Sequence, residues 1–382
     1  MLCPPVGMAI ARGTKGVLVV VFGAFLAAFS ALFAAASLTR VSPLHRVAPE
    51  AWAALERDDA DQAASLFRKE LQQRPGDPVL HFGAASAAYA LGQRGAALAS
   101  LKKAVELDPK FVEALTVLAQ VAYESGDSKL AMRSIEKAAA LRPSDSRLTD
   151  MLERWQRESS LHSSYLEKPA GHFRILYEGG AQQSIGDRVA RVLESEYSRI
   201  GRTLNSYPSE TLTVILYTNR EFQDITRSPS WATGGYDGRI RVAIGGRLRP
   251  DDLDRVVTHE LVHAVVASAA ARRVPAWLNE GLATYLESSD RSWVPGVLHR
   301  AGTVVPLADL ANGFSGLDEQ QALVAYAESA VAAEILCAKL GSNIGEFLKM
   351  VGDGRAIDDA LLAFQVQPDA FHSEWRRRVG LR

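Results

Sequence analysis

The sequence VVTHELVHAVV, Val256 to Val266, decides the fold of the second half of this chain, because it places polar side chains in an otherwise apolar helical segment. His259 and His263 are four residues apart, so an α-helix carries them on one face, one turn apart. Buried polar groups cost free energy unless something satisfies them. Two imidazoles at this spacing can bind one metal ion, and the adjacent Glu260 is placed to reach a water on that ion.

A second helix is expected to bring a third ligand to the two histidines. The stretch PAWLNEGLATYLE, Pro275 to Glu287, begins with a proline that suits a first helical turn. A hairpin of the two helices returns Glu280 to roughly the level of His263. Three protein ligands leave one position for water, which is the pattern of catalytic zinc. Glu287 is a rival ligand, two turns further on, that we expect to overshoot and to lie in the surrounding shell or face solvent.

These motifs resemble those of gluzincin metallopeptidases. HELVH is followed, after residues 264–279, by NEG, and AYAESAVAAEIL at 325–336 adds a weaker likeness. Together they are similar to the membrane-tethered bacterial peptidase-MA-like domains that often follow tetratricopeptide repeats. The resemblance implies zinc-assisted hydrolysis of a peptide bond, with zinc on the two histidines and Glu280 and with Glu260 as the general base.

The resemblance also bears on other parts of the site. Tyr326 is the candidate oxyanion donor by analogy with a downstream tyrosine of gluzincins, although an aromatic core residue is an equal alternative and Tyr285 is a weaker rival. Thermolysin-like relatives carry an aspartate four residues after the metal-binding glutamate, whereas this chain has Thr284. The strand Arg239 to Ile244, which alternates apolar and polar residues, is expected at the rim of the cleft, with one exposed face, and to pair with an extended peptide.

The first half of the chain repeats itself with a period of 34 residues. At this shift Gly92 falls on Gly126, and small residues and prolines coincide along residues 47–145. The pattern resembles the tetratricopeptide repeat, and the aromatic positions Tyr89 and Tyr123 match it. The resemblance implies three helix pairs that bind a protein partner or serve as a spacer.

Composition limits the function classes. The chain has 382 residues, a net charge of −1 and 47% hydrophobic residues, enough for two domains with their own cores. Balanced charge without a long basic run makes nucleic acid an unsuitable partner. Two cysteines exclude a disulfide framework and a cysteine-based zinc site.

The N-terminal region predicts a membrane anchor. Residues 17–38 carry no charge and reach about 33 Å as a helix, enough to cross a bilayer core. Residues 1–16, a short tail, include Arg12 and Lys15, which favour a cytoplasmic N-terminus and an extracytoplasmic catalytic domain at the inner membrane. The alternative is a signal peptide cleaved near Ser37, which would leave a secreted or periplasmic protein.

The predicted fold class is α+β. An all-α tetratricopeptide solenoid is followed by a capping helix and linker at 146–170 and by a zincin-like domain at 171–382. That domain is expected to contain a small sheet, the active-site helices and a helical C-terminal part. The predicted function is a membrane-tethered zinc peptidase acting on a protein or peptide. The alternatives are an interaction scaffold with an inactive peptidase domain and a zinc hydrolase of a non-peptide amide.

Overall fold

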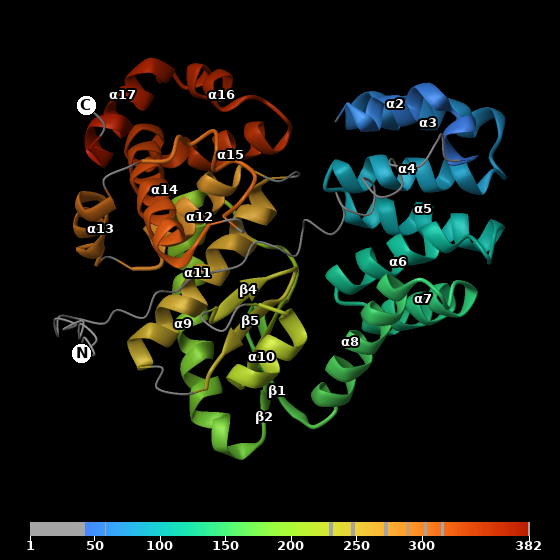
Figure 1. The fold of residues 1–382 in the computed structure, drawn as a ribbon, viewed down its shortest axis with the longest axis horizontal. Helices are drawn as coiled ribbons and strands as arrows, with labels where there is room; N and C mark the ends of the chain where they lie inside the picture. Colours follow the sequence, from blue (N-terminus) through green and yellow to red (C-terminus); the bar gives the residue numbers. More distant parts are fainter. Residues whose placement is uncertain are drawn as a thin grey trace, which may run out of the picture.

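The computed structural model describes residues 43–57, 59–228, 232–245, 249–270, 274–288, 290–301, 304–314 and 317–380. Its N-terminal part is an array of helices, blue to green in Figure 1, and its C-terminal part joins a five-stranded sheet to a helical layer. The predicted α+β class, with helical repeats followed by a small mixed sheet, is confirmed.

The helical array keeps the 34-residue period in its helix boundaries. Helices of one set begin at Pro78, Val112 and Ser146, and those of the other set begin at Ala60, Arg94 and Ser128. Gly92 and Gly126 take positive φ angles of 71° and 80° in the turns between paired helices, a conformation that glycine adopts without strain. The array consists of α2 (Pro49–Glu56), α3 (Ala60–Gln73), α4 (Pro78–Ala90), α5 (Arg94–Leu107), α6 (Val112–Glu124), α7 (Ser128–Leu141) and α8 (Ser146–His162).

Helix α8 occupies the place of the first helix of a fourth pair. The Tyr89 hydroxyl donates to Glu124 at 2.8 Å, and one period later the Tyr123 hydroxyl donates to Glu158 on α8. The indole ring of Trp155 stacks on Tyr123 with a centroid distance of 4.3 Å. The repeat register therefore extends into the segment that the sequence assigned to a cap and linker.

The sheet has the order β1-β2-β3-β5-β4. Strands β2, β3 and β5 are parallel, whereas β1 and β4 run antiparallel at the two edges. The strands are β1 (Tyr165–Ala170), β2 (Phe173–Glu178), β3 (Leu212–Tyr217), β4 (Gly234–Tyr236) and β5 (Ile240–Ala243). Strand β1 pairs with β2 throughout its length, so the last six residues of the predicted linker belong to the sheet.

The prediction for the strand Arg239 to Ile244 is wrong in position and in exposure. Strand β5 lies between β3 and β4, so the edge strand on this side of the sheet is β4. All four β5 residues are buried, and the guanidinium groups of Arg239 and Arg241 are buried with them. The alternating pattern indicated an exposed face, but the helical array covers it.

Helices form the rest of the second domain, and α11 lies at the centre of its core. Helix α11 packs on α9, α12 and α15 and on strands β4 and β5, and α12 packs on α14. Figure 1 shows α11 and α12 between the sheet and the C-terminal helices. The helices are α9 (Gln183–Leu204), α10 (Asn219–Thr226), α11 (Pro250–Ala269), α12 (Ala276–Leu286), α13 (Trp293–Ala301), α14 (Glu319–Leu340), α15 (Ile344–Gly352), α16 (Ile357–Ala363) and α17 (Pro368–Val379).

The predicted membrane anchor, transmembrane keyword and single-pass membrane localisation are corrected here. The segment 17–38 lies outside the described residues. Within the described ranges no helix combines the length and the apolar character needed to cross a bilayer. Helices α9, α11 and α14 are long enough, with 22, 20 and 22 residues, but each carries several charged side chains.

A buried ionic cluster joins the repeats to the sheet. Nη1 of Arg241 donates to Glu158 and to the Tyr217 hydroxyl, both at 2.7 Å. Its Nη2 donates to the Tyr123 hydroxyl at 2.6 Å, and its Nε donates to Asp237 at 3.0 Å. Burial alone would raise the pKa of Glu158, but the neighbouring guanidinium groups lower it to about 2. Glu158 is therefore ionised and holds a charged partner from another domain.

Replacing Glu158 by alanine should destabilise the chain by about 3–5 kcal/mol, because Arg241 would keep its buried charge without the carboxylate. Chemical denaturation measures this loss. The matched control is Glu124→Ala, which removes the equivalent carboxylate one period earlier. Tyr89 and Gln120 bond to Glu124 without a guanidinium, so the loss there should be about 1 kcal/mol. Equal losses for the two variants would contradict the interdomain role of Glu158.

The contribution of Glu158 should also depend on pH. Its pKa is lowered in the folded state from the ordinary 4.5 to about 2, so its stabilisation is complete above about pH 5 and is lost as the pH falls toward 2. The difference in unfolding free energy between the wild-type protein and Glu158→Gln should therefore shrink steadily below about pH 4.5. A difference that stays constant down to pH 3 would contradict this assignment.

Candidate metal centre

Two helices place the three predicted ligands side by side. Helix α11 begins with Pro250 at its first turn, where two aspartates suit the positive end of the helix dipole. It carries His259 and His263 into the core, where their exposed fractions are 0% and 4%. Helix α12, which begins after Pro275, brings Glu280 to them with an exposed fraction of 5%. The structure therefore brings together the three residues that the sequence separates by up to 21 positions.

The donor atoms of this group fit a metal ion. Oε2 of Glu280 lies 3.5 Å from Nε2 of His259 and 3.6 Å from Nε2 of His263. Two ligands of a tetrahedral zinc ion, each about 2.1 Å from it, are separated by about 3.4 Å. Nε2 of both histidines and this carboxylate oxygen are buried without a hydrogen-bond partner among the described residues. Because buried polar atoms are normally satisfied, a cation is the ligand that this set is suited to hold.

The charges of the group are strongly coupled. Burial would lower the pKa of His259, but the nearby carboxylates of Glu280 and Glu287 raise it to about 9. Burial would raise the pKa of Glu280, but His263 and His259 lower it to about 2. The carboxylate is therefore ionised and ready to act as a ligand. A histidine must be neutral to bind a metal, so metal binding displaces a proton from this group.

Glu287 is the hydrogen-bond partner of the His259 ring on the side away from the shared centre. Its Oε2 lies 2.7 Å from Nδ1 of His259, and its Oε1 accepts from Nη2 of Arg255 at 2.6 Å. The rival ligand therefore contacts the far nitrogen of His259, away from the shared centre. A carboxylate on that nitrogen fixes the ring and leaves Nε2 free for the metal. Thr284 is buried nearby on the same helix, and its hydroxyl has no hydrogen-bond partner among the described residues.

Glu260 faces strand β4 at Gly234, where the carboxylate occupies the space of a Cβ atom. Both carboxylate oxygens of Glu260 are buried and unpartnered among the described residues, and burial raises its pKa well above the ordinary value. A Cβ added to Gly234 would overlap Oε1 of Glu260 and approach Cγ1 of Val256 to 2.9 Å. The edge strand and the proposed base are therefore in direct contact. No motif in the sequence indicates this contact, because it depends on how strand β4 packs against α11.

A second glycine sets the approach of α12 to α14. A Cβ on Gly281 would overlap the carbonyl oxygen of Ser329 and lie 2.8 Å from its carbon. Gly281 follows Glu280 directly, so the same contact fixes the height of the third ligand. The glycine of the NEG motif is the sequence signal for this close packing.

The two candidate tyrosines have different surroundings. Tyr326, on α14, is 2% exposed, and its ring centroid lies 6.5 Å from that of His259. It also packs edge-on against Phe314 at 5.1 Å. Tyr285 is partly buried beneath the guanidinium of Arg291, 4.5 Å from its ring centroid. Tyr326 is thus beside the histidines, whereas Tyr285 lines a different surface.

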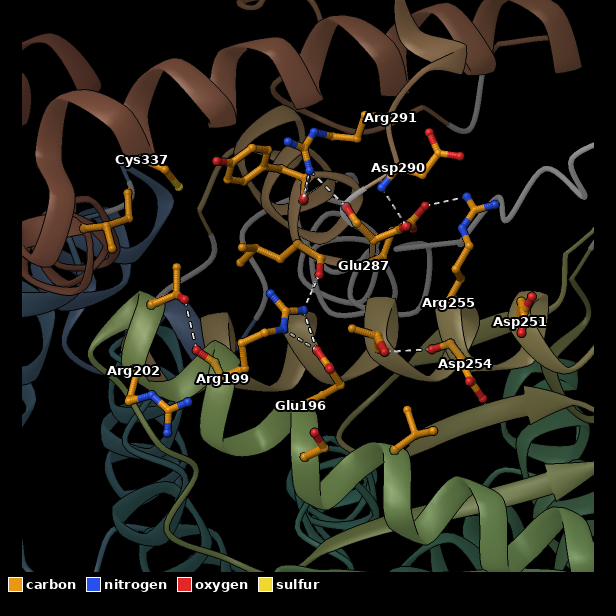
Figure 2. Close-up of a pocket in the computed structure, with 18 of the residues that line it drawn as sticks. Glu196, Arg199, Arg202, Asp251, Asp254, Arg255, Glu287, Asp290, Arg291 and Cys337 are labelled. Carbon is orange, nitrogen blue, oxygen red and sulfur yellow. Dashed lines mark hydrogen bonds and ion pairs between the residues drawn. The ribbon is translucent and has the colours of Figure 1, made fainter.

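That surface is a groove of about 1350 Å³ between α9, α11, the end of α12 and the end of α14. Figure 2 shows Glu287 and Arg255 bonded to each other at this groove, with Arg199 and Glu196 opposite. None of the three proposed ligands lines it. The groove therefore contacts the metal site only through the shell of residues behind His259.

Two family models match different parts of the chain. Residues 199–380 match the family model described as the peptidase MA superfamily, and residues 88–154 match that of the tetratricopeptide repeat. No curated protein matches the chain.

Solved structures match the repeats. The first tetratricopeptide domain of human RPAP3 is 20% identical, with a TM-score of 0.29, and the match covers 32% of this chain and 97% of that domain. The Sgt2 tetratricopeptide domain from Aspergillus fumigatus is 25% identical, with a TM-score of 0.30, over 34% of this chain and 87% of that domain.

The two family matches cover successive parts of the chain. The first includes the helices that carry His259 and Glu280, and the second covers helices with the 34-residue register. The chain therefore combines tetratricopeptide repeats, matched at residues 88–154, with a C-terminal part, residues 199–380, that is similar to the peptidase MA superfamily.

Proposed function

We propose that this chain is a zinc-dependent peptidase in which His259, His263 and Glu280 hold the metal and Glu260 is the general base. The observation that carries the proposal is the convergence of three ligand atoms within 4.8 Å of one another, all buried. Their unpartnered donor atoms support a bound cation over a purely structural cluster. The match of residues 199–380 to the peptidase MA superfamily supports hydrolysis of peptide bonds.

The chemistry divides between the metal and the protein. A zinc ion on this set supplies a Lewis acid that polarises a carbonyl and acidifies a water. Glu260 accepts the proton of the attacking water and delivers it to the leaving amine nitrogen. Burial raises the pKa of its carboxyl group, so the ionised carboxylate is a stronger base than an exposed one. Tyr326 is the proposed donor to the oxyanion, since it lies beside His259.

Strand β4 is the proposed binding edge for the substrate. It is an edge strand, and its Gly234 touches the side chain of Glu260. An extended peptide can pair with such an edge through main-chain hydrogen bonds. The small residues Gly234 and Gly235 leave the edge without bulky side chains beside the base. The repeats are the proposed docking element for a protein partner or protein substrate.

Variants of the centre should separate metal binding from catalysis. His259→Ala, His263→Ala and Glu280→Ala each remove a ligand, so zinc content and peptide hydrolysis should fall together. Glu260→Gln leaves the ligands in place and should keep about one zinc per chain, with hydrolysis reduced by about 10²-fold or more. Plasma mass spectrometry measures the zinc, and a quenched-fluorescent peptide library of mixed sequence measures hydrolysis. His299→Ala, an exposed histidine, is the control.

Three outcomes would contradict parts of this proposal. Wild-type protein that binds no zinc under metal-replete conditions would refute the metallopeptidase assignment. Zinc binding without cleavage of any peptide would point to a scaffold or to a hydrolase of another amide. Unchanged zinc content and activity in Glu280→Ala would show that the third ligand is a different residue.

The hydrogen bond between Glu287 and His259 leads to a separate prediction. Glu287→Gln keeps the size of the side chain but removes the charge that orients and polarises the imidazole, so zinc affinity should fall by about 10–100-fold. Competition with a chromophoric chelator measures the affinity. Asp290→Asn, an exposed acid on the same segment, is the matched control and should leave it unchanged. An affinity equal to that of the wild type in Glu287→Gln would contradict the orienting role.

A further inference from the structure

The hairpin of β4 and β5 has a separate neighbour at each end. At one end Gly234 touches Glu260 and Val256 on α11. At the other end the turn at residues 237–239 meets the helical repeats. The two strands are paired between these points, with Gly234 opposite Val242 and Tyr236 opposite Ile240. Only the three residues of β4 therefore separate the turn from the residue that touches the proposed base.

The turn is seated on the junction of α6 and α7. Gly238 has a φ of +94°, and a Cβ there would lie 2.6 Å from the carbonyl oxygen of Glu124, the last residue of α6. Nη2 of Arg239 donates to the carbonyl of Tyr123 and to Oγ of Ser128, both at 3.1 Å. Its guanidinium stands 4.3 Å from the centroid of the Tyr123 ring. These contacts hold the turn against backbone and side chains of the repeats.

Arg241 locks the same hairpin from its second strand. It is 2% exposed and donates to four groups on four segments: Glu158 on α8, Tyr123 on α6, Tyr217 on β3 and Asp237 in the turn. Two of these partners belong to the repeats. A guanidinium can serve four acceptors because its donors form a planar fork, which a lysine ammonium cannot reproduce.

We infer that Arg241 is a positioning residue: it anchors the β4–β5 hairpin to the repeat array and thereby fixes the edge strand beside Glu260. The repeats are then a structural part of the peptide-binding edge as well as a docking element. The catalytic part of this inference rests on the proposed function, because it assigns substrate pairing to β4. The structural part, that the hairpin loosens without its anchor, stands independently of zinc and substrate.

Hydrogen–deuterium exchange of the full chain tests the structural part. In Arg241→Met, amides of residues 232–245 should exchange at least about tenfold faster, while those of α14 and α15 change little. Because Glu158 would then be buried without its partner, the double variant Glu158→Gln/Arg241→Met removes both charges and keeps the test valid if the single variant fails to fold. Compared with Arg241→Met, Arg241→Lys should regain more of the global unfolding free energy than of the exchange protection in residues 232–245, because lysine keeps the charge without the fork of donors. Arg220→Met is the control, since that side chain is 93% exposed.

The kinetic part uses one peptide that the wild-type protein cleaves. The variants should keep about one zinc per chain and raise KM more than they lower kcat, because the binding edge is disordered while the ligands are retained. Uniformly faster exchange across the chain, or wild-type exchange in residues 232–245 of both Met variants, would overturn the inference. Absence of any cleavable peptide would refute the proposed function instead and leave the exchange result to stand by itself.

Discussion

The burial of three ionisable side chains on two adjacent helices is the constraint on which the second domain depends. His259, His263 and Glu280 are at most 5% exposed, and the helices that carry them pack within the apolar core of the domain. Uncompensated, such groups would destabilise the core, so the packing around them must hold them in one arrangement. Gly281 brings α12 close to α14, and the pair of Glu287 with Arg255 fixes the outer side of His259. The same packing contacts therefore form the core and hold the site residues in position.

Contacts from outside α11 and α12 complete this arrangement. Gly234 in the sheet closes against Glu260, and Tyr326 on α14 covers His259. The hairpin that contains Gly234 is held in turn by side chains of the repeats. Two regions that match separate families thus meet at a shared set of buried charges. The proposed catalytic domain therefore depends on side chains of the repeats to hold the β4–β5 hairpin.

Local periodicity made much of this predictable from the sequence. The 34-residue shift fixed the repeat register, and the four-residue spacing of His259 and His263 fixed their common helix face. The hairpin argument brought Glu280 to them, because helix rise converts residue numbers into distances. Contacts without a periodic signal were not predictable. The order of β4 and β5 and the burial of Arg241 depend on how the repeats cover the sheet, and an alternating strand with arginines ordinarily indicates a solvent-exposed face.

The paired bonds of Tyr89 with Glu124 and of Tyr123 with Glu158 show that the same junction occurs twice in the array. Only the second copy is occupied by an arginine of the sheet. The array can therefore lengthen or shorten by whole 34-residue units on its N-terminal side without altering the junction that supports the hairpin. A gain or loss of one residue within α8 before Glu158 would instead move the carboxylate by about 100° around the helix axis and misalign it. Repeat number is free to vary in this architecture, whereas the phase of the last repeat is not.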